Sequence, residues 1–324
     1  MRMLIAAWIA VAIIGVTPAA ATAAYPDRPV RIVVVVPPGT AADIMARTIG
    51  AKLAERLKQP FVIENRPGAS SLIGSDAVAK APPDGYSLLL FNSAQTGAAS
   101  LDPKFPLDVE RDFAPVGMLG RSPFILAVSS EFAPKTVAEF IALAKAQPGK
   151  INYGSGGYGS PSHLGMELLA IRARIKLTHV PYKGQAAYNP ALANNEIQIA
   201  LGTVPGFLPI VGTGKVRPFA AGGPKAPKEF PGIPTVAASG FPGYDLDIWL
   251  SLVTTAGSPP EAIRTLNEAL RAILTDPATV AELEKKGFVT DPSTPEDLGA
   301  FIKADVRNWK EVVQRANLTE TAAK

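Results

Sequence analysis

The 324-residue chain contains no cysteine and only two histidines, His163 and His179. Without cysteine there is no disulfide framework, no thiolate nucleophile and no cysteine to carry a lipid anchor. The two histidines are 16 residues apart, and scattered carboxylates do not complete the ligand spacing of a metal site. We therefore expect neither a bound metal nor a cofactor.

Long apolar runs are scarce and occur only at the amino terminus. Arg2 precedes an apolar stretch between Met3 and Val16, and small residues follow as far as Ala24. A positive start, a short apolar segment and small residues are typical of a secretory signal peptide. A retained membrane anchor is the alternative, but the run is short for a bilayer span. We interpret residues 1–24 as a signal peptide and expect a periplasmic mature protein.

A large excess of either charge is also lacking. The chain has 32 Lys and Arg against 28 Asp and Glu, a formal net charge of +4, with no clustered basic stripe. This pattern argues against a nucleic-acid partner and is compatible with weak attraction of anions. Hydrophobic residues make up 47% of the chain, as in a packed globule. The length of the mature chain favours two domains over one.

Glycine and proline separate segments that alternate between strand and helix patterns. A continuous β-branched run at 30–36 predicts a strand buried on both faces, as in a parallel sheet covered by helices. The elements that follow predict a βαβαβ lobe: a helix from about 43 to 57, a strand at 61–64, a helix at 72–80 and a strand at 86–91. We therefore expect an α/β fold.

A second α/β unit is predicted from residue 124 to residue 221, beginning with a strand at 124–128, and the pattern becomes helical from Pro259 onward. We expect these last helices to pack on the first unit, so that the chain crosses between two lobes near 124 and 248. The predicted organisation is a signal peptide at 1–24, lobe 1 at 25–123 plus 249–324, and lobe 2 at 124–248.

Two loops share one physical design. Residues 37–43 and 154–162 each join a predicted strand to a helix start through small residues. Small residues let a ligand approach the backbone, and the first N–H groups of a helix lack internal partners and attract anions. Ligands of open α/β sheets bind beyond the carboxyl ends of the strands. Facing loops would therefore form an anion-binding cleft, although each alone is compatible with a turn capped by Thr40 or Ser160.

Two enzymatic interpretations lack their signals. Residues 154–159 match GxGxxG, but the next predicted strand ends in Tyr182 and not in the acid of a dinucleotide site. A periplasmic serine hydrolase is the main enzymatic alternative, and the chain has no GxSxG nucleophile motif. We expect a binding protein and no catalytic residues.

Several short motifs together resemble a known family. They are Tyr25–Pro29, Glu64–Ala69, Pro83–Tyr86, Asp112–Val116, Tyr153–Gly156, His179–Gly184 and Pro234–Val236. In this order they resemble the Bug-type receptors of tripartite tricarboxylate transporters. The resemblance implies a type II periplasmic binding protein fold, with two lobes that are each a mixed, mainly parallel sheet flanked by helices, and two crossovers.

The same resemblance implies a function. Family ligands include di- and tricarboxylates, aromatic acids and acidic amino acids. The implied partners are a small carboxylate and the membrane permease subunits of a tripartite tricarboxylate transporter. The alternative partner is a sensor protein of a signalling system. We expect a monomer.

The predicted ligand-binding residues come from both loops and from other strand ends. They are Gly39, Thr40, Ala41, Ala42, Asp43, Asn92, Ser93, Ser155, Gly156, Ser160, Ser162, His163, Tyr182 and Thr203. Asp43 is open to two roles, holding its loop or reaching the ligand; so is His163, as a contact or a helix cap. Trp249 would line the cleft or pack in the core. The family often has an acidic or amide residue where Gly202 stands, which argues against an amino-acid ligand.

Overall fold

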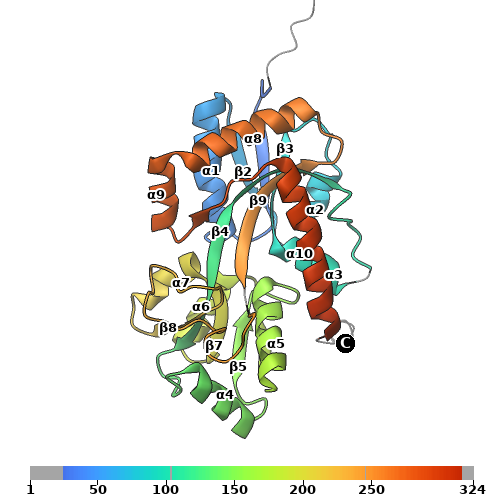
Figure 1. The fold of residues 1–324 in the computed structure, drawn as a ribbon. Helices are drawn as coiled ribbons and strands as arrows, with labels where there is room; N and C mark the ends of the chain where they lie inside the picture. The colour runs from blue at the N-terminus through green and yellow to red at the C-terminus, as the bar shows by residue number, and fades with distance from the viewer. Residues whose placement is uncertain (1–24, 103, 245, 316–324) are drawn as a thin grey trace, which may run out of the picture.

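The computed structural model describes residues 25–102, 104–244 and 246–315, so the predicted signal peptide lies outside the described residues. The chain forms an α/β sheet with the strand order β2-β1-β3-β9-β4-β7-β5-β6 (Figure 1). Its upper part in Figure 1 contains β1 to β3 and its lower part contains β5 to β8. We call these parts lobe 1 and lobe 2.

Lobe 1 is built on the strands that follow the predicted signal peptide. Its first elements are β1 (Val30–Val34), α1 (Ala41–Leu57), β2 (Phe61–Asn65), α2 (Leu72–Ala79), β3 (Ser87–Asn92) and α3 (Ser93–Leu101). Strand β1 pairs in parallel with β2 and β3. Ile32 belongs to a hydrophobic cluster with residues of α1 and α8 (Pro260–Thr275), whereas Val33 belongs to another cluster with residues of α2 and α10 (Pro295–Arg315). This arrangement confirms the strand buried on both faces that the β-branched run predicts.

Lobe 2 also consists of alternating strands and helices. It contains α4 (Val137–Ala146), β5 (Asn152–Ser155), α5 (Pro161–Ala173), β6 (Thr178–Pro181), α6 (Gln185–Ala193), β7 (Ile199–Thr203), α7 (Val204–Val211) and β8 (Val216–Ala221). Strand β5 pairs in parallel with β6 and β7. The carboxyl ends of these strands, followed by α5, α6 and α7, therefore lie at one edge of the sheet.

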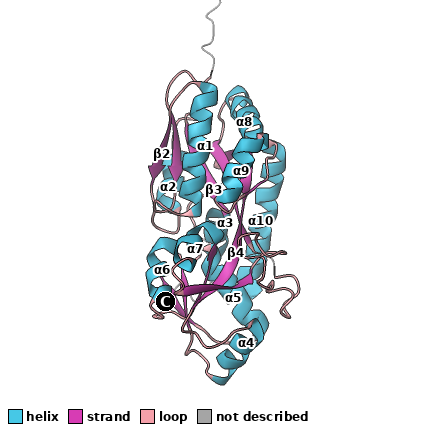
Figure 2. Cartoon of the chain, turned by 90° about the vertical axis from the view of Figure 1, so that its left-hand side faces the viewer, coloured by secondary structure: helices cyan, strands magenta, loops and turns pink. Residues whose placement is uncertain are grey.

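Strand β4 (Phe113–Ser129) belongs to both lobes. Its first part, as far as Pro123, pairs with β9 (Asp247–Thr255), and its last part, from Phe124, pairs with β7 and β8. Figures 1 and 2 show β4 running from one lobe into the other. We propose the same lobe limits as from the sequence, because the pairing partners of β4 change at residue 124.

The sequence prediction of a strand starting at Phe124 is wrong at its beginning, because β4 starts eleven residues earlier, at Phe113. Register shifts after Pro115 and after Met118 break the alternation of buried and exposed side chains, which is the signal for a strand. Strand β9 and helices α3 and α7 are absent from the sequence prediction. Helix α3 is rich in Ser, Thr and Gly, which are poor helix formers, so tertiary packing and its Asn92 cap sustain it.

The carboxyl-terminal elements are α8 (Pro260–Thr275), α9 (Pro277–Lys285), β10 (Val289–Thr290) and α10 (Pro295–Arg315). Helices α8 and α10 pack on lobe 1, as predicted. Helix α10 also reaches lobe 2, because Trp309 and Val313 join the hydrophobic cluster that contains Leu164 of α5. Helix α10 therefore adds a contact with lobe 2 to the predicted packing on lobe 1. Within the described residues, no helix has the length and apolar character needed to span a membrane.

Candidate functional site

A cavity of about 520 Å³ lies where the two lobes meet. Its walls are the loops after β1, β2 and β3 of lobe 1 and those after β5, β6 and β7 of lobe 2. Phe124 and Ile248 contribute from the strands that join the lobes. Helices α1, α2, α3, α5, α6 and α7 all begin at these loops. This is where open α/β sheets bind ligands.

The two lobes are in contact around the cavity. The Ser70 hydroxyl in lobe 1 donates to the Tyr158 carbonyl oxygen in lobe 2 over 3.4 Å. A Cβ atom added to Gly97 of α3 would lie 3.2 Å from the carbonyl oxygen of Gly159, so α3 approaches the lobe 2 loop closely. A Cβ atom on Gly184 would lie 3.6 Å from Cδ of Pro37. The described arrangement is therefore a closed one.

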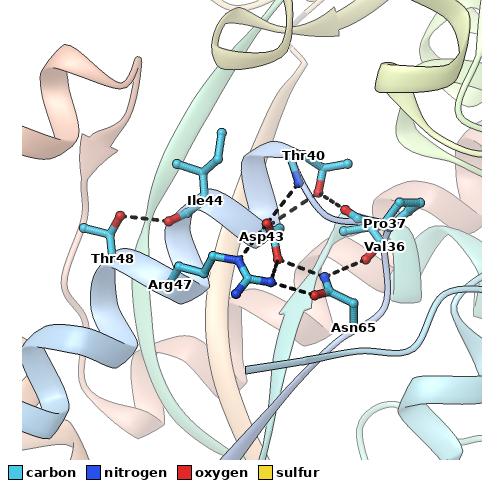
Figure 3. Close-up of polar contacts among 9 residues, drawn as sticks. Val36, Pro37, Thr40, Asp43, Ile44, Arg47, Thr48 and Asn65 are labelled. Atoms are coloured by element: carbon cyan, nitrogen blue, oxygen red, sulfur yellow. Dashed lines mark hydrogen bonds and ion pairs between the residues drawn. The ribbon is translucent and has the colours of Figure 1, made fainter. Parts of the chain in front are cut away.

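Asp43 anchors the lobe 1 loop (Figure 3). Its carboxylate accepts from the Gly39 amide at 2.9 Å, from Nε of Arg47 at 3.0 Å and from Nδ2 of Asn65 at 2.9 Å. Asn65 also donates to the Val36 carbonyl, which ties β2 to the same loop. Burial by itself raises the pKa of Asp43, but these hydrogen bonds and the Arg47 charge outweigh it, and the net pKa is lowered. Asp43 is buried and lies outside the cavity lining. Of its two predicted roles, the geometry supports holding the loop.

Replacement of Asp43 with alanine is expected to lower the free energy of unfolding by about 3 kcal/mol, because several charge-assisted hydrogen bonds are lost together. Ligand affinity falls in the same variant, because the Gly39 amide and the start of α1 lose their anchor. Urea denaturation and calorimetric titration measure the two effects. Arg28→Ala, which removes the exposed ion pair with Asp84, is the control and should change both by little. Unchanged stability in D43A would contradict the anchoring role.

The start of α1 offers main-chain donors to the cavity. The Thr40 hydroxyl accepts from the Asp43 amide and donates to the Pro37 carbonyl at 3.1 Å. The hydroxyl proton is therefore used inside the loop and is not available to a ligand. Ala41 and Ala42 occupy the first turn, where N–H groups have no helical acceptor. Both residues line the cavity.

The glycine loop of lobe 2 uses more of its donors internally than the sequence suggests. The Gly156 amide donates to Oγ of Ser162 at 3.0 Å, and the Ser160 hydroxyl caps the His163 amide. Pro161 is the first residue of α5 and has no N–H. Gly156 therefore lines the cavity with its amide already paired to Ser162.

The start of α6 is a part of the site that the sequence prediction missed. Gly184 precedes α6 with a φ of 96° and no side chain to cap the helix. Lys183, Gly184 and Gln185 line the cavity. The available signal is a glycine two residues after the predicted strand end at Tyr182, within the family motif His179–Gly184. Other lining residues outside the prediction include Pro67 to Ser71, Tyr158, Phe124, Ala94 and Ile248.

The predicted residues divide into two groups in the structure. Those that line the cavity are Thr40, Ala41, Ala42, Asn92, Gly156, Ser160, Ser162, Tyr182 and Thr203. Those that lie outside its lining are Gly39, Asp43, Ser93, Ser155 and His163, of which all but Gly39 are buried. Trp249 is also buried and packs against Phe91 and Phe301. Of its two predicted places, Trp249 therefore occupies the core.

A serine and a histidine meet beneath the glycine loop. Oγ of Ser155 lies 2.6 Å from Nε2 of His179, the geometry of a nucleophile and its base. Ser155 is fully buried, however, and within the described chain Nδ1 of His179 has no hydrogen-bond partner to orient the ring. His163 stacks on His179 with ring centroids 4.2 Å apart and accepts from the Gly159 amide. The cluster supports the loop and gives substrate no access to the hydroxyl.

Burial, and to a smaller extent the charge of the neighbouring His179 ring, lower the pKa of His163 to about 3, and burial lowers the pKa of His179 to about 4. The unfolded chain, with a histidine pKa of about 6.5, therefore binds more protons below that pH. Stability should be complete above pH 6.5 and fall by up to about 1.4 kcal/mol per pH unit for His163 as the pH drops toward 4. Because His179 is more exposed, its contribution is smaller. Denaturant titrations of the wild type and of H163N/H179N measure the slope, and an equal slope in both would contradict this account.

The chemistry of the cavity wall is mostly apolar. Among the described residues that line it, Lys183 is the one charged side chain, and it is exposed. Pro67, Phe124, Pro161 and Ile248 provide apolar surface. The positive ends of the helix dipoles converge on this wall and favour negative charge. The fold and the site together define a two-lobed solute-binding protein.

Comparisons with known proteins agree with this class. A family model described as the tripartite tricarboxylate transporter family receptor matches residues 45–318, and the chain belongs to this family. Protein BugT of Bordetella pertussis is 32% identical over 325 residues, which cover 100% of this chain and 98% of BugT. The expected Bug-type resemblance and the two-lobed periplasmic binding protein fold are thereby confirmed.

Solved structures show the same fold with carboxylates. R. palustris Rpa4515 with adipate is 31% identical with a TM-score of 0.87, covering 90% of this chain and 98% of that one. MatC from Rhodopseudomonas palustris with bound malate is 28% identical with a TM-score of 0.84, covering 89% and 100%. The periplasmic binding protein BugD is 29% identical with a TM-score of 0.84, covering 91% and 99%.

Proposed function

We propose that this protein is an exported periplasmic receptor that captures a small carboxylate in the cavity between its lobes and presents it to the membrane subunits of a tripartite tricarboxylate transporter. One observation carries the proposal. Helix starts from both lobes converge on a closed cavity, and among the described residues its lining has a single charged side chain, the exposed Lys183. Main-chain amides at helix starts bind carboxylates without a basic residue.

The proposed mechanism is closure around the ligand. The ligand first binds the loops of one lobe, and bending of the strands that join the lobes, β4 and β9, brings the other lobe to it. Contacts such as the hydrogen bond between Ser70 and Tyr158 then form only in the closed state. A partner that contacts both lobes at the same time would distinguish the loaded receptor from the empty one.

Export supports the same proposal. Residues 1–24 have the pattern of a secretory signal peptide, and the absence of cysteine leaves no site for a lipid anchor. Relatives with adipate and malate suggest ligands with two acid groups. We propose a di- or tricarboxylate or an aromatic acid as the ligand class, and a receptor that turns over no substrate.

A thermal-shift screen of adipate, malate, citrate and benzoate tests the proposal. A true ligand at one hundred times its dissociation constant adds about 2.7 kcal/mol to stability, a shift of several degrees for a chain of this size. Receptor-dependent uptake of that ligand by cells carrying the transporter tests presentation. No shift with any acid, or hydrolysis of a carboxylate ester by the pure protein, would contradict the proposal.

A further inference from the structure

Gln185 forms part of the cavity wall through an unusual set of contacts. It is the first residue of α6, is half-buried and lines the cavity. Its Oε1 accepts from the Thr203 amide at 3.0 Å and from the Thr203 hydroxyl at 2.9 Å. Its Nε2 donates to the Thr203 carbonyl at 3.1 Å. The amide group therefore fixes the end of β7 to the start of α6 at the cavity edge.

Two glycines leave the space that this side chain occupies. A Cβ atom added to Gly202 would lie 2.7 Å from Nε2 of Gln185, and one added to Gly206 would lie 2.5 Å from the same atom. Both distances are shorter than those that real Cβ atoms make to their neighbours. The amide cannot easily move aside, because three hydrogen bonds join it to Thr203. The Gln185 amide therefore fills the space that Gly202 and Gly206 leave open because they have no Cβ atom. In particular, it occupies the place of a side chain at residue 202.

This arrangement determines which polar atoms of the Gln185 amide can face the ligand. Both acceptor positions of Oε1 are used by Thr203, so the amide retains one N–H as its free hydrogen-bonding group. No acidic side chain lines the cavity among the described residues, and the charged residue that does, Lys183, is positive. An ammonium group here would be buried without a counter-charge and close to positive helix ends, which is costly.

We propose that Gln185 determines ligand selection: it admits carboxylates whose far end is a hydrogen-bond acceptor and excludes those that end in an ammonium group. The inference rests on the proposed function of the cavity as a carboxylate site. It goes further, because it assigns discrimination among acids to one side chain. Gln185 acts as a specificity-determining residue through its remaining N–H and its neutral charge.

Matched ligands of equal length test the proposal by isothermal titration calorimetry. Adipate and 6-aminohexanoate differ at one end group, as do succinate and 4-aminobutanoate. The wild type should bind the better dicarboxylate at least 100-fold more tightly than its amino analogue. Gln185→Glu keeps the shape and adds a negative charge, so it should weaken dicarboxylate binding and lower this preference at least tenfold.

Gln198 provides a matched control. Its amide also joins two backbone groups, accepting from the Asn152 amide at 2.9 Å and donating to the Asn195 carbonyl at 2.9 Å. Gln198 lies at the opposite end of β7 and outside the cavity lining, so Gln198→Glu should leave the preference unchanged. Gln185→Ala removes the donor without adding charge and should lower the affinity for the dicarboxylate while its circular dichroism stays native.

The possible outcomes distinguish failure of the proposed role of Gln185 from failure of the proposed function. An unchanged preference in both Gln185→Glu and Gln185→Ala, with acids still bound, would overturn the role of Gln185 alone. Wild-type binding of an amino analogue as tightly as its dicarboxylate would do the same. Folded wild-type protein that binds no acid of either series or of the earlier screen would overturn the proposed function as well.

Discussion

Replacing Ala42 with proline is expected to lower carboxylate affinity about 10- to 100-fold, with the melting temperature changed by only a few degrees. A hydrogen bond to a charged group contributes about 1.5–3 kcal/mol, and proline removes the N–H that would donate it. The fold survives because Ala42 is the second residue of α1, where proline costs no helical hydrogen bond. Calorimetric titration against the best acid of the screen measures the effect.

Ala42→Gly is the control for this prediction. It removes the methyl group from the buried face of α1 but keeps the amide N–H that proline would lose, so its affinity should stay within a few-fold of the wild type. An affinity loss in A42G equal to that in A42P would mean that packing of the side chain, and not the main-chain donor, controls binding. Full affinity in a folded A42P protein would contradict the role of this helix start.

Filling the cavity is expected to have an effect of similar or larger size. Ala94 is near the start of α3, is half-buried and lines the cavity. A tryptophan at this position would occupy much of the space of about 520 Å³ and compete directly with the ligand. We expect at least a 100-fold loss of affinity with little loss of stability, because the new side chain enters empty space and disturbs no packed contact.

Ala142→Trp on the exposed face of α4 is the matched control, since it adds the same side chain outside the cavity lining. Its affinity should equal that of the wild type. Wild-type affinity in A94W as well would show that the ligand binds elsewhere, and a stabilised but non-binding A94W would agree with occupation of the cavity by the indole.

The parts of the fold with strong local signals could be predicted from the sequence. The β-branched run at 30–36 predicts β1, and the small residues after it predict the loop and helix start that line the cavity. The same reasoning missed α3, because its Ser, Thr and Gly residues have low helix propensity and its stability comes from the Asn92 cap and from packing. Local propensity contains no information about such tertiary support.

The finer features of the site depend on which side chains pair with which groups in the folded structure. The amide of Gly156 is occupied by Ser162, and the place of a side chain at residue 202 is taken by Gln185. Neither contact follows from spacing, because each needs the relative positions of elements in three dimensions. The role of Asp43 is intermediate. Its place at a helix start suggests a cap, but its partner Asn65 comes from another strand.

The most direct measurement is a crystal structure with adipate bound. The account predicts the ligand in the cavity between the lobes. It also predicts a carboxylate oxygen at about 2.7–3.2 Å from the amide nitrogen of Ala41 or Ala42, and further main-chain contacts from the start of α6. A ligand outside this cavity, or a carboxylate held mainly by the ammonium group of Lys183, would contradict the claim that helix starts from both lobes bind the acid.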